Sequence, residues 1–137
     1  MKKYLKFLSL FWIITLVVSC SDQIISTCDT GEDIAQKVTF SYLQNEVFTP
    51  LCVGCHGGSA PQGKLDLSAG NAYYNLVNAA STSSQLKRVK PGDSQSSYLM
   101  KRMRGEGNET VMPPGGKLAT VLLDSIAAWI DRGAPQD

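Results

Sequence analysis

The stretch "LCVGCHGG" at positions 51–58 gathers the residues best suited to chemistry. Cys52 and Cys55 have two residues between them, and His56 follows the second cysteine directly. Two thiols at this spacing beside an imidazole can attach a haem, bind zinc, cycle as a redox dithiol or close into a structural disulfide. His56 is the only histidine in the chain, so the choice between these chemistries depends on this one stretch.

Each alternative to haem attachment lacks a supporting feature. A Cys3His zinc site would need Cys28 as its fourth ligand, but Cys28 lies in a polar N-terminal segment, and adjacent Cys and His side chains rarely reach one tetrahedral ion. A redox dithiol is expected among alternating strands and helices, which the surrounding sequence does not predict. A Cys52–Cys55 disulfide closes so small a loop that it adds little stability. These interpretations stay open beside haem attachment.

Haem attachment gives a role to both cysteines, to the histidine and to the two glycines that follow it. A haem bonded through its two vinyl groups needs two thiols a fixed distance apart, and the spacer between Cys52 and Cys55 supplies that distance. The iron needs an imidazole on the same turn, which His56 provides. Gly57 and Gly58 would let the backbone approach the porphyrin closely. We therefore predict one haem c, held covalently by both cysteines, with His56 as an iron ligand.

The second axial ligand has to come from elsewhere, because the chain holds no other histidine. Met112 opens "MPPGG", where prolines restrict the backbone and a loop can present the thioether. Met100 and Met103 lie three apart on a predicted helix, a spacing more typical of core packing. We predict Met112 as the second ligand, with Met103, Met100 or an open site as the alternatives.

The N-terminus has the features of an export signal. Three lysines within residues 1–6 precede an apolar run at 7–18, whose length suits a secretory signal better than a membrane span. The run closes on "VVSC", which resembles a bacterial lipobox, so Cys20 is the predicted lipidation site and membrane anchor. An uncleaved anchor and an ordinary signal peptide are the alternatives. We expect an exported cell-envelope protein, a periplasmic or outer-membrane lipoprotein.

The charge balance gives no indication of a nucleic-acid partner. Removing the predicted signal peptide, residues 1–19, would take three of the 13 Lys and Arg and none of the 12 Asp and Glu, which leaves a nearly neutral chain. A local basic excess lies within 86–104. These residues could bind haem propionates, dock an acidic redox partner or form a solvated helix face. They are Lys87, Arg88, Lys90, Lys101, Arg102 and Arg104, of which Arg88 and Lys90 are the propionate candidates.

Short helices are expected to position these residues. Residues 20–37 are polar and predict a tether, so the domain is residues 38–137. Apolar residues at helical spacing predict a helix over about 41–49. Thr39 or Ser41 would cap it, and Pro50 would keep Thr49 out of the helical region, so that the helix ends before the cysteines. Residues 65–79 predict a strand-like entry and a short helix with Ser68 as its cap.

Two further helices are expected in the second half. Asp93 or Ser94 would cap a helix that ends near Arg104, and the glycines and prolines of 104–117 predict a loop. The last helix, about 119–132, would stop at Gly133 and place four apolar residues on one face: Leu122, Ile126, Trp129 and Ile130. The fold class is all-α, with about four short helices and long loops. Such a domain has a limited apolar core, so a buried porphyrin would add stability.

Five segments, "CVGCHGG", "GKLDLS", "VKPGDSQSSYLMKRM", "MPPGG" and "IAAWIDRGAP", together resemble class I c-type cytochromes, most of all the planctomycete-type cytochrome c domain. The resemblance covers about 38–135. It implies a small cytochrome c-like fold around one haem, with thioethers at Cys52 and Cys55, proximal His56 and distal Met112. It also implies that the first and last helices cross near their ends, with Phe48 and Trp129 as contacts.

One departure from the wider family concerns the histidine. Mitochondrial-type members carry a proline well after this histidine, and its carbonyl orients the imidazole. In this chain Pro61 comes early, so the resemblance predicts no acceptor for His56.

His/Met ligation would fill both axial positions of the iron. The expected function is therefore outer-sphere transfer of single electrons between donor and acceptor proteins, rather than enzymatic catalysis. One alternative is a haem module docked on a periplasmic dehydrogenase, and another is a peroxidase or sensor with a labile distal site. The tether favours a self-standing carrier on a membrane surface.

Overall fold

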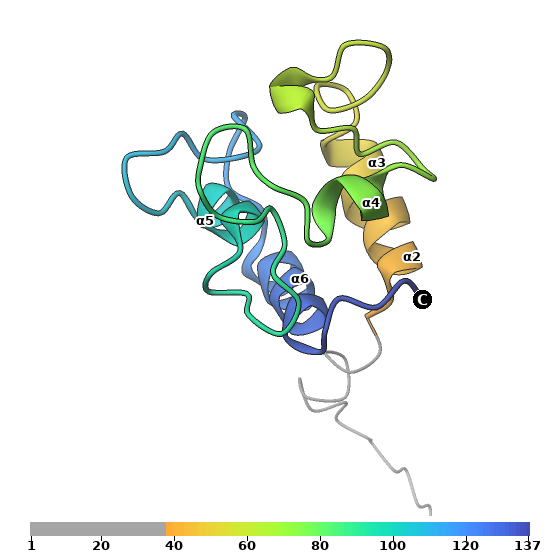
Figure 1. Cartoon of the computed structure of the whole chain (residues 1–137), viewed down its shortest axis with the longest axis vertical. Coiled ribbons are helices and arrows are strands. Elements are labelled where there is room, and N and C mark those ends of the chain that lie inside the picture. The colour runs from red at the N-terminus through yellow and green to blue at the C-terminus, as the bar shows by residue number, and fades with distance from the viewer. Residues whose placement is uncertain (1–37) are drawn as a thin grey trace, which may run out of the picture.

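The computed structural model describes residues 38–137. The predicted signal peptide (1–19), Cys20 with its tether (20–37) and Cys28 lie outside the described residues. Within residues 38–137 the chain forms helices joined by long loops (Figure 1) and has isolated bridges but no strand. This confirms the expected all-α class. None of the described helices is long and apolar enough to cross a membrane.

The first helix runs without a break through α2 (Phe40–Leu43), the π-helical turn η1 (Gln44–Phe48) and α3 (Thr49–Leu51). Thr39 caps its start as predicted, since its hydroxyl accepts the Tyr42 N–H at 3.0 Å. The helix ends ahead of the cysteines, as expected.

The prediction that Pro50 excludes Thr49 from the helix is wrong, because Thr49 has φ −62° and ψ −53°. In the π-helical turn the Thr49 N–H donates to the Gln44 carbonyl, so the hydrogen-bond register widens just before the proline. Pro50 then lies in the first turn of the segment assigned as α3, and the backbone at Thr49 keeps helical angles ahead of it.

Helix α4 (Ala72–Leu76) is the short helix predicted after the cysteines, but its start differs from the prediction. The Ser68 hydroxyl does not cap it. Instead Ser68 Oγ donates to Asp66 Oδ1 at 2.6 Å, and the Ser68 carbonyl accepts the Ala72 N–H at 3.0 Å. The predicted strand-like entry forms no strand.

Helix α5 (Tyr98–Arg104) begins later than predicted. Asp93 Oδ1 accepts the Ser96 N–H at 2.9 Å, and Ser97 Oγ donates to the Asp93 carbonyl at 2.8 Å. These bonds close a turn in place of a first helical turn. The helix ends at Gly105, whose φ of 65° is the left-handed conformation that glycine adopts without strain.

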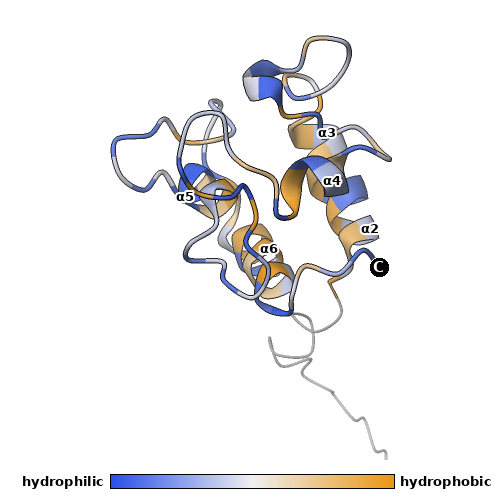
Figure 2. Ribbon diagram, in the orientation of Figure 1, coloured by the Kyte–Doolittle hydropathy of each residue, from blue (hydrophilic) through white to orange (hydrophobic). Residues whose placement is uncertain are grey.

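Helix α6 (Thr120–Asp131) matches its predicted range and supplies much of the core. In Figure 2 the colour of apolar residues covers much of α6, and also parts of α4 and of the first helix. Phe40, at the start of α2, places its ring centroid 5.6 Å from that of Trp129 and 6.1 Å from that of Phe48. The first and last helices therefore meet near their ends, and Phe40 makes both ring contacts.

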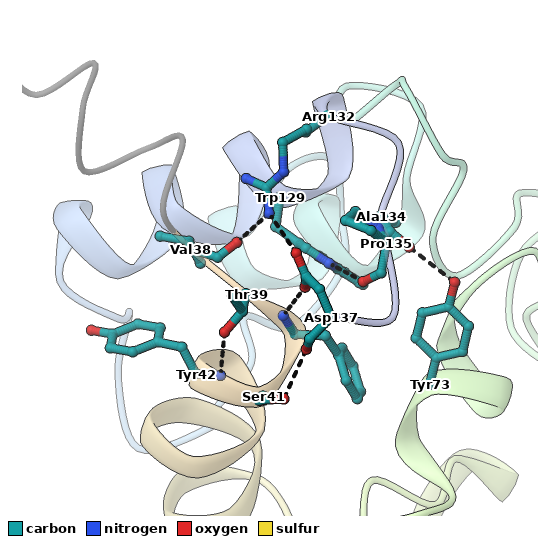
Figure 3. Close-up of polar contacts among 11 residues, drawn as sticks. Val38, Thr39, Ser41, Tyr42, Tyr73, Trp129, Arg132, Ala134, Pro135 and Asp137 are labelled. Atoms are coloured by element: carbon teal, nitrogen blue, oxygen red, sulfur yellow. Dashed lines mark hydrogen bonds and ion pairs between the residues drawn. The ribbon is translucent and has the colours of Figure 1, made fainter.

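The end of the described chain returns to the start of α2 (Figure 3). The Phe40 N–H donates to Asp137 Oδ1 at 2.7 Å, and the Ser41 N–H donates to the Asp137 carbonyl at 3.1 Å. The Arg132 guanidinium reaches both the Val38 carbonyl and the Asp137 carboxylate. The two bonds that Asp137 accepts from Phe40 and Ser41 satisfy N–H groups at the start of the first helix.

Two aromatic side chains fix the segment that follows α6. Trp129 Nε1 donates to the Pro135 carbonyl at 2.9 Å, and the Tyr73 hydroxyl donates to the Ala134 carbonyl at 3.0 Å (Figure 3). Helix α4 is thus tied to the C-terminal segment, and the described chain closes on itself.

Candidate functional site

One cavity of about 300 Å³ brings together all the predicted site residues of the domain. Its lining includes Cys52, Cys55, His56, Arg88 and Met112. The cysteine stretch follows α3 and the methionine loop follows α5, on opposite sides of the molecule in Figure 1. Most of the remaining lining is apolar, with leucines at 51, 65, 67, 76 and 99. A concave apolar site with a few polar groups is typical of cofactor binding.

The two thiols and the imidazole belong to one turn. The Cys55 and His56 N–H groups both donate to the Cys52 carbonyl, at 3.1 and 2.8 Å. Both cysteines are free, Cys55 exposed and Cys52 half-buried. Burial raises the pKa of the Cys52 thiol to about 11, so this thiol is protonated at neutral pH. The turn presents two unbonded thiols to the same cavity.

The His56 ring is oriented by a backbone carbonyl. Its Nδ1 lies 2.9 Å from the carbonyl oxygen of Gln62, in the short 3-10 helix η2 (Gln62–Lys64). A carbonyl only accepts, so Nδ1 carries the proton and donates, and Nε2 keeps its lone pair. This is the tautomer that ligates a metal through Nε2, with the ring held by its other nitrogen. Gln62 follows Pro61 directly. Its carbonyl is the acceptor for which the sequence offers no candidate, because every residue has a main-chain oxygen and no residue type identifies this one.

Gly57 is required by the turn itself. A Cβ at this position would lie 2.7 Å from Val53 Cγ1 and 2.8 Å from the Val53 carbonyl oxygen. Side-chain atoms do not approach so closely without displacement of the backbone. The turn that carries the cysteines therefore has no room for any residue other than glycine at position 57.

Arg88 is buried, with 8% of its surface exposed, and it lines the cavity. Its Nη1 donates to the Asn75 carbonyl at 3.0 Å, and its Nη2 donates to the carbonyls of Gly63 and Lys64 at 3.1 and 3.0 Å. Burial lowers the pKa of this guanidinium, which nonetheless remains charged in proteins. Within residues 38–137 its Nε–H has no protein acceptor. Arg88 thus places a buried positive charge beside the cavity.

The remaining basic side chains of 86–104 mostly pair within the chain. Lys90, the other propionate candidate, does not line the cavity and bonds to Asp93 instead. The three basic side chains of α5 pair with two acidic residues that follow the helix. The ion pairs, with nitrogen–oxygen distances, are Lys90–Asp93 at 2.8 Å, Lys101–Glu106 at 3.4 Å, Arg102–Glu109 at 3.0 Å and Arg104–Glu106 at 3.7 Å.

The three methionines of residues 38–137 have different positions. Met100 is fully buried and does not line the cavity, whereas Met103 lines it from α5 with 3% of its surface exposed. Met112 lines it from outside any helix, and its N–H donates to the Arg102 carbonyl at 2.9 Å. Both α5 methionines pack in the core, as their spacing predicted.

Between positions 38 and 137, no group of three or more His, Cys, Asp or Glu side chains could hold a metal ion. The zinc interpretation depended on Cys28, which lies outside these residues. The donor set that the described residues do offer is two thiols, one imidazole and one thioether around an apolar cavity. This set fits a covalently attached haem.

An all-helical domain in which a C-x-x-C-H turn and a methionine loop line one cavity has the arrangement of a c-type cytochrome domain. Residues 52–116 match the family model described as planctomycete cytochrome C. This region is therefore a planctomycete-type cytochrome c domain, which confirms the resemblance in the sequence and implies covalently bound haem c. No curated protein and no solved structure matches the chain.

Proposed function

We propose that the domain holds one haem c, bonded to Cys52 and Cys55 and ligated by His56 and Met112, and that it carries single electrons. The observation that supports this proposal most strongly is the shared cavity of these four side chains. The His56 tautomer set by the Gln62 carbonyl supports it further, because it leaves Nε2 free to ligate.

The residues around the site have separable roles. The two cysteines would hold the cofactor covalently, and His56 and Met112 would ligate its iron. The leucines of the lining exclude water from the interior. When bound, the haem supplies one-electron redox chemistry, with a potential raised by methionine ligation relative to a second imidazole. If His56 and Met112 both ligate the iron, no ligand position would remain for a substrate.

Electrons would enter and leave where the cavity meets the surface. Leu51 lines the cavity and is 43% exposed, so the cavity opens at the end of α3. Ser81, Thr82 and Ser83 also line it. We propose this edge for contact with a redox donor and acceptor.

Arg88 is the proposed partner of a haem propionate. Its guanidinium is fixed by three carbonyls and lines the cavity. A buried cation held in this way is a strong hydrogen-bond donor to a carboxylate.

The proposed setting is the cell envelope, with Cys20 lipidated and residues 20–37 as a tether. The support is the sequence alone, namely the lysines, apolar run and "VVSC" of residues 1–20. Metabolic labelling with a fatty acid should mark the chain and fail to mark Cys20→Ser. Equal labelling of both chains would rule out Cys20 as the lipidation site.

The ligation is tested by optical spectra of the chain exported with a haem-attachment system. The wild type should give a low-spin spectrum with a Met–iron charge-transfer band in the oxidised form. Met112→Leu should lose that band and bind cyanide rapidly, whereas Met100→Leu, a change of similar volume outside the cavity, should keep it. His56→Ala should abolish the normal spectrum.

Retention of the band by Met112→Leu would contradict Met112 as the ligand. Rapid cyanide binding by the wild type itself would favour the labile distal site instead.

A further inference from the structure

The segment that carries Met112 has little structure of its own. We call residues 107–117 the distal loop; it contains no helix or strand. One hydrogen bond lies within it, from the Gly116 N–H to the Pro113 carbonyl at 3.2 Å. A glycine- and proline-rich segment of this kind needs contacts with the rest of the domain to hold one conformation.

Within residues 38–137, the polar contacts between the distal loop and the rest of the domain all involve Arg102. Arg102 Nε donates to the Thr110 carbonyl at 3.0 Å, and Arg102 Nη1 forms an ion pair with Glu109 Oε2 at 3.0 Å. The Arg102 carbonyl accepts the Met112 N–H at 2.9 Å. Within residues 38–137, no other hydrogen bond or ion pair joins the distal loop to the rest of the chain.

Arg102 is itself held in place. Its Nη1 lies 3.2 Å from the Tyr98 hydroxyl oxygen, one turn earlier on α5, and its Cζ lies 5.8 Å from the Tyr98 ring centroid. Its side chain is 20% exposed, while its bonds to Thr110 and Glu109 lie at the surface. Tyr98 and Arg102 both line the cavity. The guanidinium thus links the wall of the cavity to the loop that presents Met112.

We propose that Arg102 is a positioning residue that holds the distal loop, and with it Met112, against the cavity. The inference rests on the proposed role of Met112 as axial ligand. Loss of the guanidinium frees the Thr110 carbonyl and Glu109 together, and leaves the Met112 N–H as the single remaining bond. The loop then opens more often, and the thioether leaves the cavity with it.

The fork of the guanidinium is the feature that lysine lacks. Arginine donates in one plane from Nε and both Nη atoms, so it reaches Thr110 and Glu109 at once, while lysine offers one ammonium on a flexible stem. Arg102→Lys should therefore keep the charge and lose part of the restraint. Arg104 provides the matched control, because it lies on the same helix and pairs with Glu106, outside the distal loop.

The test measures two rates in the oxidised haem-loaded protein. Amide hydrogen exchange at residues 107–117 reports the opening of the loop, and the rate of cyanide binding reports displacement of the distal ligand. Arg102→Gln should raise both rates about tenfold or more, as the loss of charge-assisted hydrogen bonds implies. Arg102→Lys should be intermediate. Arg104→Gln should stay within about twofold of the wild type, because Arg104 pairs with Glu106, outside the distal loop.

Exchange and cyanide rates within about twofold of the wild type in Arg102→Gln would overturn the proposal. If that variant fails to fold, Glu109→Gln removes the ion pair alone. It should speed amide exchange in the distal loop several-fold. An unchanged exchange rate in this variant would also overturn the proposal. The two readouts separate the two proposals. Faster exchange in Arg102→Gln with no effect of Met112→Leu on cyanide binding would retain the restraint and reject Met112 as the ligand.

Discussion

Three successive carbonyls of one short turn orient the imidazole of His56 and the buried guanidinium of Arg88. The Gln62 carbonyl accepts from His56, and the carbonyls of Gly63 and Lys64 accept from Arg88. The imidazole and the buried cation are therefore coupled through η2. A shift of this turn moves both groups, so Arg88 supports the site even before any contact with a cofactor.

Arg88→Met should destabilise the domain by about 2–4 kcal/mol, because it leaves three carbonyls around a buried site without their donor. Urea unfolding of the haem-loaded protein measures the free energy of unfolding. Lys90→Gln removes an exposed ion pair two residues away and should cost less than about 1 kcal/mol. Equal losses in the two variants would contradict the structural role of Arg88.

The lowered pKa of the Asp93 carboxyl makes the free energy of unfolding depend on pH in the acid range. Hydrogen bonds from Lys90 and from Ser96 hold the pKa of its carboxyl down at about 2. A carboxyl whose pKa is lower in the folded state stabilises fully above its unfolded pKa, near 4, and loses that contribution as the pH falls toward 2. Asp93→Asn should therefore be less stable than the wild type at pH 6, with a gap that narrows between about pH 4 and 2. Urea unfolding across this range measures the gap, and a constant gap would contradict the assignment.

The residue types of the site were predictable from the sequence, but their restraints were not. Cys52, Cys55, His56 and Met112 are recognisable by side chain and spacing. The acceptor for His56 is a main-chain oxygen, which every residue possesses, so no pattern marks Gln62. Arg102 was grouped with its basic neighbours, since its partner Glu109 lies in a loop whose path the sequence does not determine.

At the level of elements, the end of the first helix determines where the thiols lie. The Cys52 and Val53 N–H groups both donate to the Phe48 carbonyl at 3.0 Å, so the cysteine turn continues directly from α3. Gly57 then packs against Val53 with no space for a Cβ. The geometry of the attachment turn thus depends on a helix end and one glycine.

Gly57→Ala should displace Val53 and distort the cysteine turn, at a cost of about 1–3 kcal/mol typical of overpacking. The yield of covalent haem on a denaturing gel should fall with it. Gly54→Ala is the control within the same turn, because a Cβ at Gly54 meets no atom within 4 Å, and its effect should be about 0.5 kcal/mol or less. Normal haem yield and stability in Gly57→Ala would refute this account of the turn.

Sequence patterns predicted helices best where an apolar face and an end signal agree. Helix α6 matches its predicted range because its apolar residues recur at helical spacing and Gly133 follows it. Helix α5 starts at Tyr98, five residues after Asp93, because the polar residues before Tyr98 satisfy their own backbone groups in a turn. Pro50 was treated as a terminator because the widened register before it has no signature in the local residue types.

For the molecule as a whole, aromatic contacts join helices that are far apart in the sequence. The Phe40 ring lies 5.6 Å from Trp129 and 5.2 Å from Tyr73, between ring centroids. The bonds from Asp137 to the start of α2 reinforce the same region (Figure 3). Because α2 leads into the cysteine turn, this cluster fixes one wall of the cavity relative to α6.

Phe40→Ala should lower the free energy of unfolding by about 2–4 kcal/mol, since it removes a ring that packs on three aromatic partners. Tyr42→Ala is the matched control, an aromatic residue on the same helix with 44% of its surface exposed, and it should cost about 1 kcal/mol or less. Urea unfolding of the two variants compares them directly. A smaller loss for Phe40→Ala than for Tyr42→Ala would contradict the proposed junction.

The central claim is that this polypeptide carries one haem bonded through two thiols. Intact-mass measurement of the exported protein, denatured and treated with reductant, tests it most directly. We predict a mass increase of one haem that persists under these conditions and disappears in the Cys52→Ser, Cys55→Ser double variant. The mass of the bare polypeptide, or an increase unchanged in the double variant, would contradict the claim.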